Sequence, residues 1–176
     1  MNRDPELKIL ISKRKIAATL KRLADEVRRD YSEKTPLLIG ILKGSFVFMA
    51  DLVRQLDFPL EIDFIRLSSY SGTQSSGQIT LVHELPTSIL NRHVLIVEDI
   101  VDTGLTTTFL CNYIRQKGPA SLKLCSLIDK PSRRKIPVDI DYLGLSIPNL
   151  FIVGYGVDYN EQYRNLPDIC VIESEE

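Results

Sequence analysis

Three carboxylates and a run of hydroxyl side chains directly follow one apolar stretch of the sequence. The apolar residues Val-Leu-Ile-Val at 94–97 lead into Glu98, Asp99 and Asp102, and then into Thr103, Gly104, Leu105, Thr106 and Thr107. Open α/β sheets bind their ligands beyond the carboxyl ends of strands, where this pattern places these side chains. The backbone N–H groups at the start of a helix, together with the threonine hydroxyls, predict a phosphate cradle, and Gly104 would let the phosphate approach the backbone.

The acids beside this cradle need another partner, because carboxylates repel a phosphate. We therefore expect Glu98 and Asp99 to hold sugar hydroxyls or a water bound to Mg²⁺, which makes a sugar phosphate the expected ligand. The segment lacks the lysine of a Walker A loop and the spacing of a G-x-G-x-x-G fingerprint. The spacing leaves one alternative open, in which Asp102 caps a helix and the other two acids are solvated.

The elements around this loop alternate between strands and helices. Apolar runs predict strands at 36–42, 60–67, 79–83, 93–97, 121–128, 139–143, 151–153 and 169–172, with helices at 45–56 and 103–117. From Pro5 to Tyr31 the apolar spacing predicts one amphipathic helix, with Ser12 as the position where it could break. Residues 68–77 are polar and predict a loop or hairpin arm. This order predicts an α/β fold with a mostly parallel open sheet flanked by helices, and the absence of repeats and linkers predicts a single domain over 1–176.

Composition excludes several classes of partner. The chain has 176 residues and a formal net charge of −1, so we expect neither nucleic acid nor a membrane as partner. The three cysteines and two histidines have no zinc or disulfide spacing. The sequence contains no run of 18 apolar residues, and its first residues lack the apolar core of a signal peptide, which predicts a cytoplasmic protein.

The segment 94–107 resembles the signature of the phosphoribosyltransferases that use 5-phosphoribosyl 1-pyrophosphate. An apolar strand, two acids, two apolar residues, Asp-Thr-Gly and hydroxyl residues follow in that order. More narrowly, the chain resembles the hypoxanthine (hypoxanthine-guanine) phosphoribosyltransferases from about Leu37 to Ile172. The resemblance implies the type I phosphoribosyltransferase fold with a small base-binding hood. It also implies transfer of the phosphoribosyl group to N9 of hypoxanthine or guanine, which gives IMP or GMP and pyrophosphate in purine salvage.

Four further segments carry the narrower resemblance, and two of them concern the donor. Lys43-Gly44 resembles the pyrophosphate loop, where an unusual peptide geometry is expected, and Ser69-Tyr70 resembles the Ser-Tyr of a lid that closes over the substrates. In a later segment Asp158 matches a Mg²⁺-binding carboxylate, and Arg164 matches a basic residue near the pyrophosphate. The resemblance therefore implies Mg²⁺ as cofactor, with Glu98, Asp99 and Asp158 as its protein ligands.

The other segments concern the base. Lys130 matches the lysine that donates a hydrogen bond to the purine 6-oxo group. Tyr142 matches the aromatic residue that stacks on the purine, and Leu143 matches the residue whose backbone reads the edge of the base. The resemblance makes Asp102 the general base for the N7 proton. Members of the family are commonly dimers or tetramers, so it also implies a homo-dimer or homo-tetramer.

One residue departs from the pattern, and one other function stays open. Several relatives carry a basic residue where this chain has Leu105, so the cradle would rely on backbone and hydroxyl groups. The alternative is a non-catalytic regulator that binds RNA through the basic patch at 130–135, which the net charge disfavours. Among enzymes, Lys130 disfavours adenine, because an ammonium group cannot accept a hydrogen bond from an amino group. Nothing in the sequence ranks hypoxanthine, guanine and xanthine.

Overall fold

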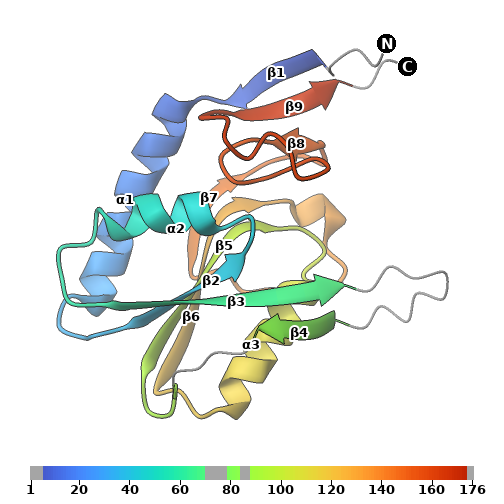
Figure 1. The fold of residues 1–176 in the computed structure, drawn as a ribbon. Helices are drawn as coiled ribbons and strands as arrows, with labels where there is room; N and C mark the ends of the chain where they lie inside the picture. Colours follow the sequence, from blue (N-terminus) through green and yellow to red (C-terminus); the bar gives the residue numbers. More distant parts are fainter. Residues whose placement is uncertain (1–5, 70–78, 84–87, 174–176) are drawn as a thin grey trace.

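A six-stranded sheet forms the centre of the protein (Figure 1). The structure is a computed structural model, and it describes residues 6–69, 79–83 and 88–173. The strands lie in the order β4 (Ile79–His83), β3 (Glu61–Ser69), β2 (Leu37–Leu42), β5 (His93–Val101), β6 (Ser121–Asp129) and β7 (Tyr142–Ser146). Every neighbouring pair is parallel except β3 and β4. The prediction of a mostly parallel α/β sheet flanked by helices is confirmed.

Helices cover both faces of this sheet, which explains why its central strands read as continuous apolar runs. Helices α1 (Lys13–Tyr31) and α2 (Phe46–Val53) pack on one face, and α3 (Leu105–Gln116) packs on the other. Alternate residues of a strand point to opposite faces. In β5, Leu95 and Val97 therefore join the core under α1 and α2, whereas Val94 and Ile96 join the core under α3.

The first residues form a strand, so the prediction of a helix from Pro5 is wrong for this part. Strand β1 (Glu6–Ile11) pairs antiparallel with β9 (Ile169–Glu173), which also pairs with β8 (Ile152–Val153). The helix starts only at Lys13, because the Ser12 hydroxyl accepts a hydrogen bond from the Lys15 N–H at 3.3 Å and caps it. The partner of β1 lies at the other end of the sequence, so local spacing could not show it.

Strand β7 also lies further along the chain than predicted. It spans Tyr142–Ser146, whereas the apolar pattern had placed a strand at 139–143. The Asp141 carboxylate accepts a hydrogen bond from the Leu124 N–H at 2.9 Å, so this residue ends the preceding loop and β7 starts beside β6 at Tyr142. None of the helices in the described ranges is both long enough and apolar enough to cross a membrane.

Candidate functional site

The carboxyl ends of three neighbouring parallel strands bring the predicted segments together. Strand β5 lies between β2 and β6, so the loops that follow these strands meet at one edge of the sheet. The loop after β2 contains Lys43 and Gly44, and the end of β5 supplies the acids. Lys130 follows β6, and its N–H donates to the Val101 carbonyl at 3.0 Å. This edge is the candidate active site.

Close backbone packing joins the loop after β2 to the end of β5. The peptide bond between Leu42 and Lys43 is cis, which is the unusual geometry expected there. A Cβ on Gly44 would lie 2.1 Å from Asp99 Oδ2, so only glycine leaves room for this carboxylate beside the loop. A Cβ on Gly156 would lie 2.1 Å from the Gly44 carbonyl oxygen. The loop 42–45, the end of β5 and the loop around Gly156 therefore form one packed unit.

Glu98 and Asp99 are buried carboxylates, so the alternative in which they are solvated is wrong. Burial raises the pKa of Asp99 to about 6. Burial and the neighbouring charge of Asp99 raise the pKa of Glu98 well above its usual range. Within the described ranges Glu98 Oε2 has no hydrogen-bond partner. Buried acceptors without partners are costly unless a ligand satisfies them, which is the arrangement expected for groups that hold sugar hydroxyls.

The start of α3 lies at this edge, where the sequence predicts a phosphate cradle. Gly104 has φ of +85° and stands at the N-cap, so the helix begins at Leu105 rather than at Thr103. A Cβ on Gly104 would lie 2.4 Å from the Ile136 carbonyl oxygen. The first N–H groups of a helix have no partner within it and carry the positive end of its dipole. The N–H groups of residues 104–107 therefore present an anion-binding surface at this edge.

Side chains around the cradle differ in their exposure. Thr103 and Thr106 are half-buried, so their hydroxyls stand at the rim, whereas Thr107 is buried against the core under α3. Leu105 is exposed and supplies no charge. The cradle within residues 103–107 thus consists of backbone N–H groups and two threonine hydroxyls.

Asp102 and Lys130 are near enough for their charges to interact. Asp102 is half-exposed and forms an ion pair with Arg133, in which Nε and Oδ1 are 2.9 Å apart. Lys130 is buried, and this burial lowers the pKa of its ammonium group while the charge of Asp102 acts in the opposite direction. A buried ammonium beside a carboxylate can donate to one atom of a planar ligand while the acid accepts from another.

Asp158 and Arg164 meet the loop after β2 through charged contacts. The Arg164 guanidinium lies 2.9 Å from Asp158 Oδ1 and 3.1 Å from Glu161 Oε2. Lys43 Nζ lies 2.9 Å from the same Glu161 oxygen. Predicted donor-binding residues from two distant segments are therefore neighbours.

The comparisons with known proteins agree with this geometry. A family model described as "Phosphoribosyl transferase domain" matches residues 8–160. The chain belongs to the phosphoribosyltransferase family. The hypoxanthine-guanine phosphoribosyltransferase of Bacillus subtilis is 45% identical over 98% of this chain and 96% of that protein. The protein of the same name from Streptococcus pneumoniae strain R6 is 46% identical over 96% of this chain and 94% of its own.

Solved structures in this family have the same fold. A hypoxanthine-guanine phosphoribosyltransferase of Bacillus anthracis, with HEPES in its active site, superposes with a TM-score of 0.91 at 42% identity, covering 97% of this chain and 100% of that one. The hypoxanthine phosphoribosyltransferase of Trypanosoma cruzi in complex with the product IMP superposes with a TM-score of 0.88 at 42% identity, covering 96% and 95%. The type I phosphoribosyltransferase fold is thereby confirmed.

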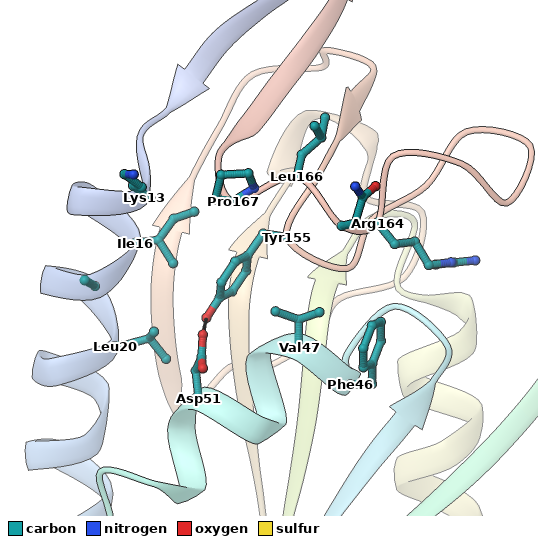
Figure 2. A pocket seen from close by; sticks show the side chains of 12 residues that line it. Lys13, Ile16, Leu20, Phe46, Val47, Asp51, Tyr155, Arg164, Leu166 and Pro167 are labelled. Carbon is teal, nitrogen blue, oxygen red and sulfur yellow. Dashed lines mark hydrogen bonds between the residues drawn. The ribbon is translucent and has the colours of Figure 1, made fainter.

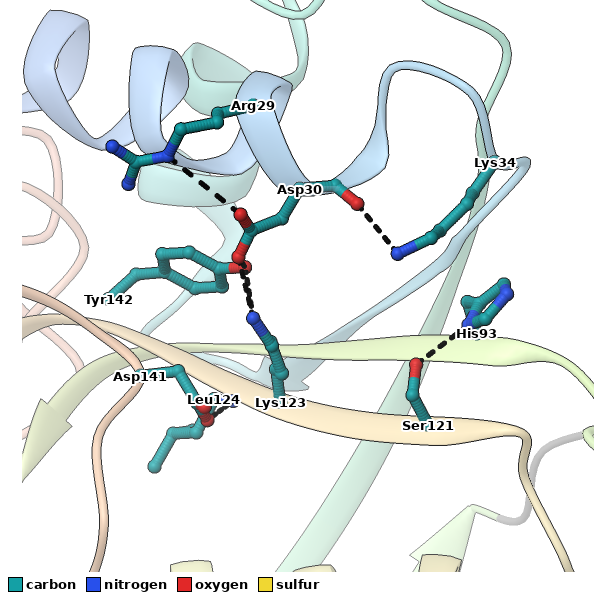
Figure 3. A network of polar contacts seen from close by, with 9 residues as sticks. All are labelled: Arg29, Asp30, Lys34, His93, Ser121, Lys123, Leu124, Asp141 and Tyr142. Atoms are coloured by element: carbon teal, nitrogen blue, oxygen red, sulfur yellow. Dashed lines mark hydrogen bonds and ion pairs between the residues drawn. The ribbon is translucent and has the colours of Figure 1, made fainter.

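Tyr142 and Leu143 do not lie at the carboxyl end of the sheet, so the prediction that they bind the base is wrong. Tyr142 is only 3% exposed, and its hydroxyl donates to Asp30 Oδ2 of α1 at 2.6 Å (Figure 3). The Leu143 carbonyl accepts from Arg22 of α1 at 2.8 Å. In the register of the sheet Tyr142 stands beside Cys125, well before the carboxyl end of β6 where Lys130 lies. Neither the Tyr142 ring nor the Leu143 carbonyl is available to a base at that end.

Phe151 is the aromatic residue that sequence reasoning missed. It is 55% exposed, and its ring meets Tyr159 edge-on with centroids 5.5 Å apart. Tyr159 directly follows Asp158, so Phe151 borders the candidate site. The signal was present in the sequence, because an aromatic residue flanked by Leu150 and the apolar β8 stands shortly before the Asp158 segment.

Two other predictions concern the lid and the metal. Tyr70 lies outside the described residues, and Ser69 is the last residue of β3. Within the described ranges no three His, Cys, Asp or Glu side chains lie close enough together to hold a metal ion. The structure therefore does not bring Glu98, Asp99 and Asp158 together as one three-carboxylate site.

A separate cavity of about 550 Å³ lies behind the donor-binding loops (Figure 2). It opens between α1, α2 and the segment 164–167, and mostly apolar side chains line it. On its wall the Tyr155 hydroxyl donates to Asp51 Oδ2 at 2.6 Å. This hydrogen bond links α2 to the loop that contains Asp158.

The buried acids predict a stability that falls as the pH rises. Because the pKa of Asp99 is raised in the folded state, the folded protein binds more protons than the unfolded chain, and the free energy of unfolding decreases between about pH 4 and pH 7. We expect Asp99→Asn to increase the free energy of unfolding at pH 7.5 by about 1–3 kcal/mol, and by less at pH 4. Urea unfolding at both values, without divalent cations, measures this. A variant less stable than wild type at pH 7.5 would contradict it.

Proposed function

We propose that this protein transfers the 5-phosphoribosyl group from 5-phosphoribosyl 1-pyrophosphate to N9 of hypoxanthine or guanine. The names of its close relatives support this reaction, as does the complex of the Trypanosoma cruzi enzyme with IMP. The observation that carries the proposal is the end of β5, where two buried carboxylates stand beside the glycine-started helix α3. A ribose 5-phosphate needs both hydroxyl acceptors and an anion cradle, which Glu98, Asp99 and the N–H groups of residues 104–107 would supply in that order along the chain.

Different residues at this edge would bind different parts of the donor. The N–H groups of residues 104–107 would bind the 5′-phosphate. Glu98 and Asp99 would accept hydrogen bonds from the ribose hydroxyls, and their negative charge would stabilise the cation that develops at the sugar as pyrophosphate leaves. Lys43 and Arg164 would attract the departing pyrophosphate. These roles require Lys43 and Arg164 to lie on the same side of the ribose. Both side chains contact the Glu161 carboxylate, which supports this.

The carboxylate oxygens at this edge suit a Mg²⁺ ion that binds mainly through the substrate. Mg²⁺ usually takes one or two carboxylates and completes its shell with phosphate oxygens and water. Asp158 is half-buried and Glu98 has a buried oxygen without a hydrogen-bond partner in the described ranges, so each fits as a single ligand. When bound, Mg²⁺ would neutralise charge that develops on the leaving pyrophosphate.

The base would lie between Asp102, Lys130 and an aromatic ring. Asp102 would accept the proton from N7 of the purine as N9 attacks C1 of the ribose. Lys130 would donate a hydrogen bond to the 6-oxo group, which supports a 6-oxopurine rather than adenine. Since Tyr142 is buried, we assign the stacking ring to Phe151.

Stacking of the purine on Phe151 gives a prediction with a natural control. Phe151→Leu should raise KM for hypoxanthine about tenfold, because base stacking on an aromatic ring contributes about 1–3 kcal/mol. Tyr142→Phe keeps the buried ring, loses only the hydroxyl's contacts with Asp30 and Lys123, and should leave this KM unchanged. Steady-state kinetics at saturating donor measures both. A rise of KM in the Tyr142 variant without one in the Phe151 variant would return the stacking role to Tyr142.

Two statements about partners belong to this proposal. We infer a homo-dimer or homo-tetramer from the family resemblance, and sedimentation velocity would test it. The alternative of an RNA-binding regulator loses support, since Arg133 is paired with Asp102 and Arg134 with Asp129, which neutralises two of the four cations of the basic patch.

A spectrophotometric assay of nucleotide formation tests the function directly. Hypoxanthine or guanine, the donor and Mg²⁺ should together give IMP or GMP and an equal amount of pyrophosphate, with adenine giving little product. Binding of RNA in a gel-shift experiment without any pyrophosphate release would overturn the proposal.

A further inference from the structure

The segment after β6 wraps around the end of β5 and holds Asp102 from one side. Residues 131–133 form a short 3-10 helix directly after Lys130, and the N–H groups of Lys135 and Ile136 both donate to the Thr103 carbonyl, at 2.9 and 3.2 Å. Lys130 itself is tied to Val101 through its N–H. The residues on both sides of Asp102 are therefore fixed to this segment by backbone hydrogen bonds.

Arg133 is the side chain of this segment that reaches Asp102. Its Nε lies 2.9 Å from Asp102 Oδ1 in an ion pair, and that oxygen is buried and has no hydrogen-bond partner in the described ranges. The Asp102 side chain as a whole is still 37% exposed, so its accessible surface lies on the atoms other than Oδ1. The charge of the arginine thus attracts the buried oxygen of the carboxylate, and the exposed part of Asp102 lies on its other atoms.

Neither Arg134 nor Lys130 is free to replace Arg133 beside Asp102. Arg134 is engaged by Asp129, and Lys130 is needed for the 6-oxo group in the proposed function. The Arg133 side chain is half-exposed and covers little of the core, so its contribution to packing is small. Its main described interaction is the one with Asp102.

We propose that Arg133 is a positioning residue for the reaction: it orients the Asp102 carboxylate so that Oδ2 meets the purine N7 proton. The inference rests on the proposed function, because it assigns the task of Asp102 from it. A carboxylate that rotates freely spends part of its time in orientations that cannot accept this proton, and misplacement of a catalytic group by about 1 Å can cost about 100-fold in rate. Removing Arg133 should therefore reduce kcat and leave binding of the donor largely intact.

Steady-state kinetics of three variants tests this role. Arg133→Ala should lower kcat about tenfold or more, with KM for the donor within about threefold of wild type. Arg133→Lys keeps a cation at this position and should recover part of kcat. Lys135→Ala, which removes an exposed cation of the same segment, should match wild type. Guanidinium at millimolar concentration should restore part of the activity of Arg133→Ala alone, because it can occupy the space left by the side chain.

The outcomes separate this inference from the proposed function. If wild type makes no nucleotide, the proposed function fails. If wild type is active and Arg133→Ala keeps kcat within twofold, the positioning role is overturned. The role is also overturned if Arg133→Ala has a lower melting temperature and guanidinium gives no rescue, since the loss would then come from the fold.

Discussion

Replacement of Asp102 by Asn is expected to lower kcat by about 10²- to 10⁴-fold, which is the usual contribution of a general base. Asn has nearly the same shape, but it cannot take a proton from N7. Because the cradle at residues 104–107 is unchanged, KM for the donor should change by less than about threefold. The loss therefore appears in kcat and reports on the chemical step.

The control for this variant is an acid outside the site. Asp139→Asn removes an exposed carboxylate from the segment that leads to β7 and should retain wild-type kcat. Steady-state kinetics with hypoxanthine and guanine measures both variants. A kcat of Asp102→Asn within fivefold of wild type would remove Asp102 from the mechanism and leave it only its ion pair with Arg133.

Replacement of Gly104 by Ala is expected to weaken donor binding strongly. The new Cβ would lie 2.4 Å from the Ile136 carbonyl oxygen, a backbone atom that cannot move alone. The residue also has φ of +85°, which costs an L-residue about 1–2 kcal/mol. The start of α3 must shift, so we expect KM for 5-phosphoribosyl 1-pyrophosphate to rise at least 30-fold, by about 2 kcal/mol of lost binding.

Gly118 provides a matched control at the other end of α3. It has φ of +69°, and an added Cβ would approach only the end of the Leu90 side chain, at 2.9 Å. Gly118→Ala should therefore lose stability to a similar extent in thermal unfolding, while KM for the donor stays at the wild-type value. An equal rise of KM in both variants would show that strain anywhere in α3, rather than the cradle, controls donor binding.

The parts of the fold that follow from local patterns could be predicted from the sequence. The run 37–42 and the run 94–97 are apolar throughout because α1 and α2 cover one face and α3 covers the other. The acids after β5 and the glycine at the start of α3 have a fixed spacing, so their meeting at one edge also followed from the sequence. These features depend on neighbouring residues and on the rule that carboxyl ends of parallel strands meet.

The features that were missed depend on distant partners. Strand β1 is stabilised by β9, which lies more than 150 residues later, and no local spacing distinguishes it from the first turns of α1. The family resemblance assigns Tyr142 to the base, whereas its environment is set by Asp30 of α1 and Lys123 of β6. The pairing of Arg133 with Asp102 could not be predicted for the same reason, because the two residues lie in different loops.

Function and stability conflict at the end of β5. Two adjacent buried carboxylates destabilise the free protein, and the raised pKa of Asp99 reports this cost. The same acids satisfy the hydroxyls of a bound sugar, so ligand binding should relieve the conflict. Natural sequences retain such local conflicts at functional sites.

A crystal structure of the protein soaked with IMP would show whether the start of α3 binds the phosphate. We expect the 5′-phosphate to lie within hydrogen-bond distance of the N–H groups of residues 104–107, with the ribose hydroxyls against Glu98 and Asp99. A structure in which IMP binds at another place, such as the cavity between α1 and α2, while the start of α3 holds no phosphate would contradict it.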